Sequence, residues 1–421
     1  MPATSQKRCL VVGSGISGLA TAIRLRQIGW EPVIVERAPD RRSGGYFVAL
    51  FGAGRAAARR LGFDDAIPDR SVRDGRTYVV DRAGHRRPGL GFGDLPGDQR
   101  MMLRGDVETA AFDALPGHVE IRFATRPTRI EQDESGVDVT LDHDGVTTTE
   151  RFDLVVGADG LRSTVRQLVF GPHEHHLHRL GHMIAALALP DPLDGVPARD
   201  GISLFEPGRA MWLFPFADRP HSLLFSYRTD DVDGQFTGRP ADRVRAAFGP
   251  EPAGPLLGPA LDALDDTGDF LFDTVEQTRM DTWSRGRVVL VGDSAWCVSL
   301  YAGMGVSAGL AGADLLGTVL HHHSGDIPAA LKSWEARLRP HLTVYQQAGL
   351  SGQSFFTPDN QRQIALRPII ARSTRLPLIG DALRFLQANS KINRERGLDI
   401  AHDSVVPPGR ANHRHQARSS A

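Results

Sequence analysis

Apolar residues recur along the chain in two spacings, which predict strands and helices in alternation. Residues 10–12 form a short β-branched run that predicts a buried parallel strand. Apolar positions at helical spacing follow from Leu19 to Leu25, and residues 32–35 form a second apolar run. A strand, a helix and a second strand within about thirty residues indicate one βαβ unit of a parallel sheet.

Later segments of the chain extend this pattern. Residues 154–156 and 287–291 predict two more buried strands, and a long helix of small residues is expected from residue 303 onward. Residues 118–148 and 171–274 alternate between apolar and polar positions, which predicts series of strands. The sequence therefore indicates an α/β fold in which sheets of different kinds are interleaved.

The C-terminal part of the chain is expected to be helical. Residues 326–348 have helical spacing, and we expect this helix to be kinked or broken at Pro340. Residues 363–389 are amphipathic, which favours a helix packed across two domains and, as the alternative, a helix on a membrane surface. Residues 406–421 are polar with proline and glycine, and we expect them to be disordered.

A glycine motif connects the first predicted strand to the first helix. Gly13 allows a tight turn, Gly15 lets the backbone approach a pyrophosphate, and Gly18 lets helix and strand pack closely. Phosphates favour the free N–H groups of a helix N-terminus, and Glu36 is placed to accept a hydrogen bond from a ribose hydroxyl. A glycine-rich turn without a ligand is the alternative. The complete unit favours a dinucleotide site made by Gly13, Ser14, Gly15, Ile16, Ser17, Gly18, Glu36 and Arg37.

Composition narrows the class of protein. The 421 residues include 49 basic and 50 acidic side chains, so we expect no nucleic-acid partner, which would require a basic surface. No apolar run reaches the roughly eighteen residues of a transmembrane helix. The two cysteines, Cys9 and Cys297, predict no disulfide framework and fit a reducing compartment. We therefore expect a cytoplasmic protein.

Three adjacent histidines, His321, His322 and His323, resemble a metal-binding tract. Adjacent residues of a helix do not face one another, however, and no cysteine or spaced histidine pair accompanies them. We interpret them as a solvated helix end and expect no metal site.

A second motif follows the strand at residues 154–156. Asp159 and Gly160 lead to Ser163, Val165 and Arg166. This segment resembles the D-G-x-x-S-x-V-R motif of the single-component flavoprotein aromatic hydroxylases, the p-hydroxybenzoate hydroxylase family.

A third motif supports the same resemblance. Gly292 and Asp293 follow the strand at residues 287–291, and residues 303–305 open the small-residue helix. The segment resembles the G-D motif of the family, in which the aspartate holds the ribityl chain of the flavin. A helix N-terminus beginning at Gly303 would present free N–H groups to a ligand above it, which in the family is the pyrimidine edge of the flavin.

The resemblance covers about residues 8–345, and it implies a fold and a domain arrangement. The expected fold is a Rossmann-type FAD-binding domain with an interleaved β-sheet substrate domain and C-terminal helices. We expect the FAD-binding domain in residues 1–75, 100–170 and 275–325, the substrate domain in residues 76–99 and 171–274, and the helical region in residues 326–405.

The resemblance also implies an activity. In the family, NADPH or NADH reduces FAD, O₂ forms a flavin C4a-hydroperoxide, and this species transfers one oxygen atom to a small molecule. No second G-x-G-x-x-G motif is present, in keeping with a nicotinamide that visits without its own domain. Beyond the first motif, the residues implied to bind FAD are Arg104, Asp159, Asp293, Gly303, Met304, Gly305 and Val306.

Departures from the family pattern keep other functions open. Trp296 and Leu300 stand where the family usually has histidine and proline, and Val107 replaces a usual leucine. A flavin-dependent reductase or halogenase of the same fold, or a flavin-binding protein without turnover, is therefore an alternative.

The predicted substrate domain carries the candidate pocket residues. Its strands are rich in aromatic side chains, which favours an aromatic or polycyclic substrate. The candidates are His182, Met211, Trp212, Phe225 and Tyr227, and no residue is identified as a catalytic acid or base.

Overall fold

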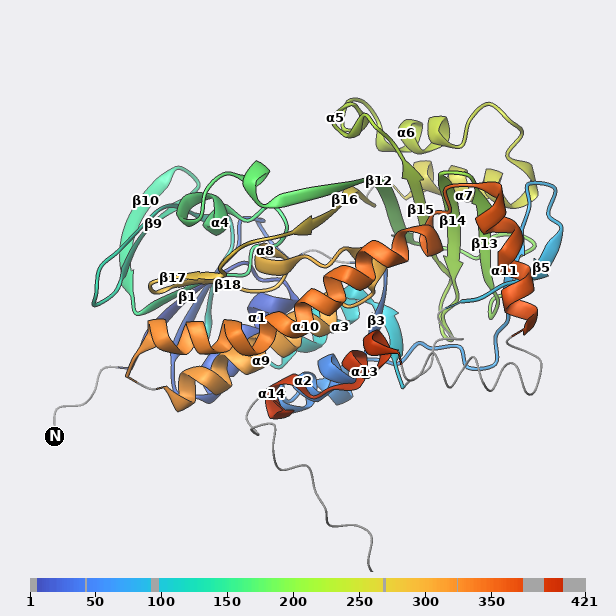
Figure 1. The fold of residues 1–421 in the computed structure, drawn as a ribbon. Helices are drawn as coiled ribbons and strands as arrows, with labels where there is room; N and C mark the ends of the chain where they lie inside the picture. The colour runs from blue at the N-terminus through green and yellow to red at the C-terminus, as the bar shows by residue number, and fades with distance from the viewer. Residues whose placement is uncertain are drawn as a thin grey trace, which may run out of the picture.

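The computed structural model contains a six-stranded sheet, in the order β17-β18-β11-β1-β2-β7, in the left half of Figure 1. The model describes residues 6–41, 44–91, 98–267, 270–323, 325–373 and 390–403. The strands are β1 (Arg8–Val12), β2 (Glu31–Val35), β7 (Glu120–Arg122), β11 (Leu154–Gly157), β17 (Ser284–Arg285) and β18 (Val288–Leu290). All neighbours pair in parallel except β17 and β18. The predicted buried strands are therefore confirmed as a parallel sheet.

Helices pack around this sheet and around one another. The glycine motif opens α1 (Ile16–Gln27), which packs on α9 (Gly305–His322), and α2 (Gly52–Leu61) packs on another side of α9. Shorter elements are α3 (Arg104–Asp113), α4 (Thr164–Val169), α8 (Asp293–Trp296), η1 (Asp64–Ala66), η3 (His173–His175) and η4 (Leu300–Ala302). The long helix described below, residues 327–356, packs on α9 as well, and α9 is therefore buried along most of its length. His321 and His322 stand at its exposed end.

Two small antiparallel sheets complete this part of the molecule. The first contains β8 (Thr125–Gln132), β9 (Val137–His143) and β10 (Val146–Phe152). The second pairs β3 (Phe47–Leu50) with β6 (Arg100–Leu103), and β6 leads directly into α3.

A seven-stranded sheet forms the second layer, in the order β16-β12-β15-β14-β13-β4-β5. Its strands are β4 (Thr77–Val80), β5 (Arg86–Pro88), β12 (Leu177–Ala188), β13 (Gly201–Glu206), β14 (Arg209–Phe214), β15 (Ser222–Arg228) and β16 (Leu271–Thr278). The strand β16 crosses the boundary that we placed between residues 274 and 275. The short helices α5 (Val232–Gln235), α6 (Pro240–Ala247) and α7 (Gly254–Asp266) follow β15 in the chain.

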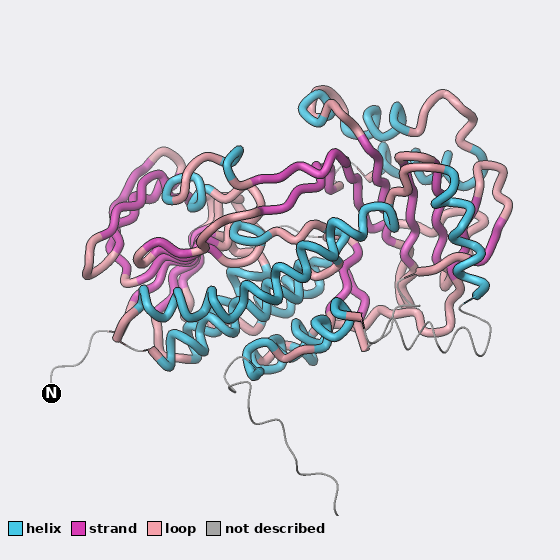
Figure 2. The backbone as a smooth tube through the Cα atoms, in the orientation of Figure 1, coloured by secondary structure: helices cyan, strands magenta, loops and turns pink. Residues whose placement is uncertain are grey.

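One long helix, α10 (Ile327–Phe356), runs from the six-stranded sheet towards the seven-stranded sheet (Figure 2). It continues through Pro340, so the helix is not broken there, and the alternative expectation of a kink stays a prediction. Proline removes one backbone hydrogen bond, but Leu338, Leu342 and Tyr345 on both sides of it are buried, and this packing holds the helix together.

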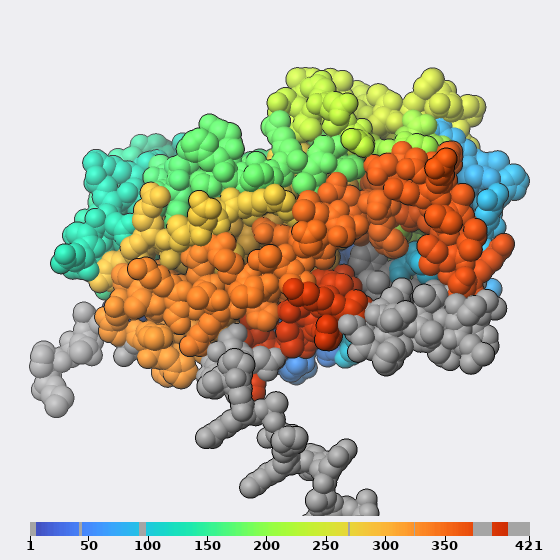
Figure 3. Space-filling model, in the orientation of Figure 1, coloured from blue at the N-terminus to red at the C-terminus, as the bar shows by residue number. Residues whose placement is uncertain are grey.

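Three more helices, α11 (Gln361–Ser373), α13 (Lys391–Gly397) and α14 (Ile400–Asp403), follow α10. In the space-filling view, α10 and α11 form much of the near surface, and α13 lies below α10 (Figure 3). The other predicted C-terminal segments, residues 374–389 and 406–421, lie outside the described residues. Within the described residues, no helix combines the length and the apolar character required to cross a membrane.

Candidate active site

The glycine motif forms a turn that only glycine can make here. Gly13 has φ of +105°, and a Cβ atom on it would lie 2.5 Å from the Ala158 carbonyl oxygen. A Cβ atom on Gly18 would lie 1.9 Å from the Gly13 oxygen, so α1 can approach β1 only without a side chain. No side chain caps α1 at Gly15, and its first N–H groups therefore remain available to an anion.

Glu36 is held beside this turn by three hydrogen bonds. Ser14 donates to its carboxylate from the backbone N–H at 3.0 Å and from the hydroxyl at 3.2 Å, and the Ala38 N–H donates at 2.9 Å. A carboxylate has about four acceptor positions, so it can still accept from a ribose hydroxyl. The neighbouring Arg37 is exposed.

Arg104 stands over the glycine turn from a different segment. One of its terminal nitrogens lies 3.6 Å from the position of a Cβ atom on Gly15. Its guanidinium donates to Glu108 at 2.6 Å. Burial alone would lower the pKa of Arg104, but Tyr46, Glu108 and Asp293 together raise it. The arginine is therefore a fixed positive charge at this site.

Asp293 brings the third motif to the same place. Its side chain is exposed, yet desolvation raises its pKa, against the opposing effects of Arg104 and the Cys297 thiol. Both observations fit a carboxylate that lies in a recess, where many protein atoms are close to it but solvent still reaches it. Tyr46, whose pKa burial raises, responds to the charges of Arg104 and Asp293 as well. Sequence reasoning missed Tyr46, which belongs to none of the motifs.

The N-terminus of α9 faces the site after a strained loop. Met304 provides no side-chain cap, so the N–H groups of Gly305, Val306 and Ser307 have no partner within the helix. Ser299 in the preceding loop has φ of +69° and ψ of 157°, a conformation that residues other than glycine rarely adopt. Such strain is typical of functional sites.

The Asp159 carboxylate forms hydrogen bonds within the second motif. Its carboxylate accepts hydrogen bonds from the Ser163 hydroxyl at 2.5 Å and from the N–H groups of Thr164 and Val165 at 2.6 and 3.1 Å. It therefore caps the first turn of α4 and fixes this loop, and the expectation that Asp159 contacts the cofactor stays a prediction.

Arg166 joins the second motif to the third. Its side chain is fully buried, and it donates to the Ser294 carbonyl oxygen at 2.9 Å and to the Leu161 oxygen at 2.7 Å. The loop that follows β11 is thereby fixed against the loop that follows β18. The three predicted motifs meet at the C-terminal ends of neighbouring parallel strands, where ligands bind in open α/β sheets.

These residues suit FAD in particular. The uncapped N-termini of α1 and α9 provide two separate places for negative charge, one for a pyrophosphate and one for a flavin ring. Glu36 stands at the first and can hold a ribose. Asp293 and Arg104, whose charges influence each other, offer the acceptor and the donors that a polyhydroxylated ribityl chain needs.

The seven-stranded sheet places two of the predicted substrate residues, Trp212 and His182, towards this site. Trp212 packs with Tyr301 and Phe356 in one apolar cluster. The ring of His182, which is buried, lies 5.7 Å from that of Tyr301 and nearly perpendicular to it. Burial lowers the pKa of His182, which favours a neutral ring.

Met211, Phe225 and Tyr227 lie on the opposite face of the sheet. They belong to a separate apolar cluster that includes buried residues of α6 and α7. Side chains alternate along a strand, so the residue next to Trp212 must point away from the site. The structure therefore corrects the expectation that these three residues contact a substrate.

A cavity of about 640 Å³ opens between η4, α10 and α13. It reaches Gly303 at the start of α9, and its walls include Tyr301, Val344, Phe355 and Ile392. Trp212 lies behind Phe355, with ring centroids 5.5 Å apart. His182 and Trp212 therefore support the wall and do not line it.

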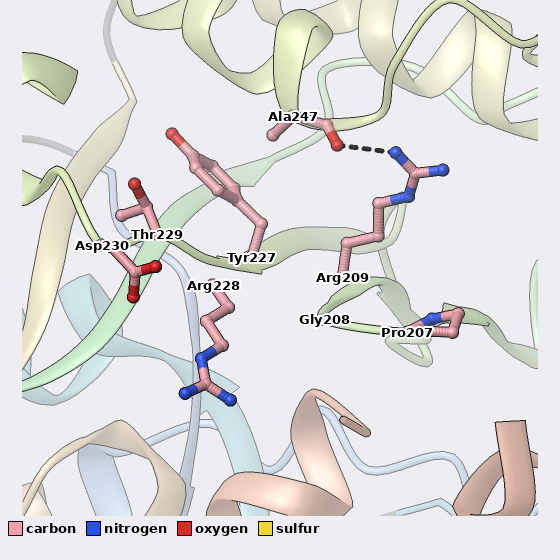
Figure 4. A pocket seen from close by; sticks show the side chains of 8 residues that line it. All are labelled: Pro207, Gly208, Arg209, Tyr227, Arg228, Thr229, Asp230 and Ala247. Atoms are coloured by element: carbon pink, nitrogen blue, oxygen red, sulfur yellow. Dashed lines mark hydrogen bonds between the residues drawn. The ribbon is translucent and has the colours of Figure 1, made fainter. Parts of the chain in front are cut away.

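A second, smaller hollow of about 350 Å³ lies at the outer end of β14 and β15 (Figure 4). Its walls include Arg209, which donates to the Ala247 oxygen at 2.8 Å, and Tyr227, whose hydroxyl donates to Gln235. None of the motif residues lines this hollow, so we assign the site to the larger cavity.

Comparison with known proteins agrees with this geometry. The model of the FAD-binding domain family matches residues 107–341. A flavin-dependent monooxygenase of Legionella longbeachae is 29% identical over 368 residues, which are 84% of this chain and 90% of that protein. A protein of Mycobacterium tuberculosis without an assigned function is 30% identical over 78% of this chain and 89% of its own length.

Solved structures share the fold. The tetracycline destructase Tet(51) superposes with a TM-score of 0.73 at 25% identity, covering 91% of this chain and 98% of its own. A variant of HpxO from Klebsiella pneumoniae, solved with FAD, has the same TM-score at 20% identity, covering 91% and 98%. The chain therefore belongs to the p-hydroxybenzoate hydroxylase-like family of FAD-dependent monooxygenases.

Proposed function

We propose that this enzyme uses NADPH or NADH together with O₂ to oxygenate an aromatic or polycyclic small molecule. The observation that carries the proposal is the cavity of about 640 Å³, which ends at Gly303 beside the N-terminus of α9. This volume lies in the range of small-molecule sites, about 300–1,000 Å³. Apolar and aromatic side chains form most of its wall. A substrate in the cavity would lie beside a flavin ring bound at the N-terminus of α9.

The residues of this chain would bind and orient the reactants. The N-terminus of α1 and Glu36 would hold the adenosine half of FAD, and Asp293 and Arg104 the ribityl chain. Bound FAD supplies the chemistry, because it can accept a hydride from the nicotinamide and pass electrons to O₂. The N-terminus of α9 would stabilise negative charge on the bound flavin ring.

The side chains around the cavity favour a site that excludes water rather than one that transfers protons. Burial raises the pKa of Tyr301 to about 12, and its hydroxyl shares a hydrogen bond with the Ser226 hydroxyl, which is also hydrogen-bonded to Thr357. Tyr301 therefore stays protonated and fixed at neutral pH. A wall of this kind would keep water away from the reacting groups.

Similarity to Tet(51) supports a polycyclic substrate, since that protein is named for the destruction of tetracycline. The relatives named flavin-dependent monooxygenase support oxygen transfer over reduction or halogenation.

The decisive experiment uses purified protein loaded with FAD. We expect the visible flavin bands to bleach under anaerobic NADPH or NADH and to return in air. With a panel of polycyclic phenols and ¹⁸O₂, we expect a substrate to accelerate NAD(P)H oxidation and to gain one ¹⁸O atom. A product reduced or halogenated without ¹⁸O would refute the proposal, as would bands that do not bleach with either nicotinamide.

A further inference from the structure

The last residues of β16 hold the segment that carries Asp293. We call the segment between β18 and α9, residues 291–304, the flavin loop, because it contains Asp293 and leads to the N-terminus of α9. The Thr278 hydroxyl donates to the Asp293 carbonyl oxygen at 2.8 Å, and the Thr278 N–H donates to the Cys297 oxygen at 3.2 Å. The Thr278 side chain is fully buried. Asp293, which we assign to the ribityl chain, is therefore fixed through its own backbone.

Gln277 holds a later part of the flavin loop. Its amide nitrogen donates to the Val298 oxygen at 3.2 Å and to the Gln346 oxygen of α10 at 2.7 Å, and its amide oxygen accepts from Arg279 at 3.0 Å. The side chain is fully buried, and both amide protons and the amide oxygen are hydrogen-bonded. Burying an amide is unfavourable without such partners, and a fully satisfied buried network fixes one arrangement of the chain.

The flavin loop requires support of this kind because its backbone is strained. Ser299 directly follows Val298, which Gln277 holds, and it has φ of +69°. The Ser299 side chain is buried, and its hydroxyl has no hydrogen-bond partner among the described residues. Such a conformation persists only where surrounding contacts impose it. The hydrogen bond from Gln277 to the preceding carbonyl group is one of these contacts.

The strand β16 also belongs to the seven-stranded sheet. It pairs with β12, with Leu177 opposite Thr278 and Met183 opposite Thr274. The Thr274 hydroxyl donates to the His182 oxygen of β12 at 3.4 Å. One strand is therefore hydrogen-bonded to the substrate sheet along its length and to the flavin loop at its end. It sets the position of the loop relative to the sheet.

We propose that Thr278 and Gln277 are positioning residues for FAD, of which Thr278 acts through Asp293, and Gln277 acts through Val298 on the approach to α9. Both side chains are fully buried, so they act on the cofactor through the backbone of the flavin loop. This inference rests on the part of the proposed function that assigns Asp293 to FAD, and not on oxygen transfer.

The test compares two threonines of the same strand. Thr278→Val and Thr274→Val each remove one buried hydroxyl, but only the first removes a hydrogen bond to the flavin loop. The apoprotein of each variant is titrated with FAD by flavin fluorescence, far below its melting temperature. We expect Thr278→Val to bind FAD about 3- to 10-fold more weakly, the effect of one hydrogen bond to a buried carbonyl group. Thr274→Val should bind FAD like the wild type, and Thr278→Ser, which keeps the hydroxyl, should recover most of the affinity.

Gln277 is tested separately with Gln277→Leu, which makes none of the three hydrogen bonds. We expect the affinity for FAD to fall about 10-fold. The visible circular dichroism of the bound flavin should change as well, because the surroundings of the ring move with the loop, whereas that of Thr274→Val should match the wild type. If Gln277→Leu does not fold, Thr278→Val and Thr278→Ser decide.

Equal FAD affinities in Thr278→Val and Thr274→Val would overturn the proposal, whether both match the wild type or both are weaker. A Thr278→Ser variant as weak as Thr278→Val would overturn it too, and unchanged affinity and dichroism in Gln277→Leu would remove the role of Gln277. These measurements need no turnover. FAD affinities in the expected order, in an enzyme that oxygenates no arene, would refute the proposed oxygenation alone. Oxygenation by an enzyme whose two valine variants bind FAD equally would refute the positioning role alone.

Discussion

The contact between α2 and α9 at Gly54 should determine how well the site is formed. A Cβ atom on Gly54 would lie 2.6 Å from Leu50 Cδ1 and 2.7 Å from the Cα of Ser307. Ser307 is in the first turn of α9, and its hydroxyl accepts from the Phe51 N–H at 3.0 Å. Because Ser307 Cα is backbone, a Gly54→Ala variant must move the first turn of α9 relative to α2.

The change in stability expected for Gly54→Ala is the difference between two opposing effects. Alanine is favoured over glycine in a helix by about 1 kcal/mol, whereas an extra methyl group in a packed contact costs about 1–3 kcal/mol. We expect Gly54→Ala to destabilise the protein by up to about 2 kcal/mol. For a chain of 421 residues, the unfolding entropy is on the order of 0.9 kcal/mol per kelvin, so the melting temperature should fall by only about 2 °C.

Affinity for FAD is the more sensitive measurement. The free N–H groups of α9 would contribute about 1 kcal/mol to binding of the flavin ring, and their displacement should weaken FAD about 3- to 10-fold. The assay is fluorescence titration of the apoprotein with FAD, beside differential scanning calorimetry. The control is Gly258→Ala in α7, where the added methyl group meets only the Ala253 Cβ, at 3.8 Å. FAD affinities that are equal in the two variants would refute the reasoning.

Three other changes test single features of the site. Burial alone would raise the pKa of Asp106, but Arg70 and the Leu103 N–H lower it below its ordinary value. The stabilisation by the Asp106 carboxylate is therefore present above about pH 4 and is lost as the pH falls below that value. Asp106→Asn should lower the free energy of unfolding by about 1–3 kcal/mol at pH 7, and its difference in melting temperature from the wild type should shrink in acid. Ser299→Gly should raise the melting temperature by relieving roughly 1 kcal/mol of strain, and a lower value would contradict the strain. Asp293→Asn should weaken FAD about 10-fold without lowering the melting temperature of the apoprotein, whereas unchanged affinity would remove Asp293 from the site.

Residues near one another in the sequence were the predictable part of this molecule. Gly13, Gly18 and Glu36 belong to one βαβ unit, whose geometry depends on local spacing. The later motifs were placed because each follows a short apolar strand. Their exact roles depend on tertiary contacts, and for this reason the capping of α4 by Asp159 was not foreseen.

The choice between the faces of the substrate sheet could not be made from the sequence. The alternation in β14 and β15 puts Met211 and Trp212 on opposite sides, but both are apolar and both are buried. The face that bears Met211 is the one on which α6 and α7 pack, and this packing is a tertiary contact that the strand pattern does not contain.

The replacement of the family histidine by Trp296 has a structural explanation. Trp296 is buried with Trp283 and Trp334, at ring distances of 4.9 and 5.7 Å. A Cβ atom on Gly312 of α9 would lie 2.8 Å from the Trp296 ring, so α9 has a glycine where the large ring passes. The three rings thus anchor the start of the flavin loop to the core, and the substitution does not open this part of the site.

The end of the same loop is held by α10, although Leu300 has replaced the usual proline. A Cβ atom on Gly349 would lie 2.3 Å from the Val298 oxygen, and one on Gly352 would lie 2.6 Å from the Tyr301 oxygen. The loop backbone therefore rests directly on the backbone of α10. Proline restricts a loop through its own φ angle, whereas here a neighbouring helix imposes the same restriction from outside. Since α10 also bears Phe355 in the cavity wall, the helix couples the position of the flavin loop to the shape of the substrate space.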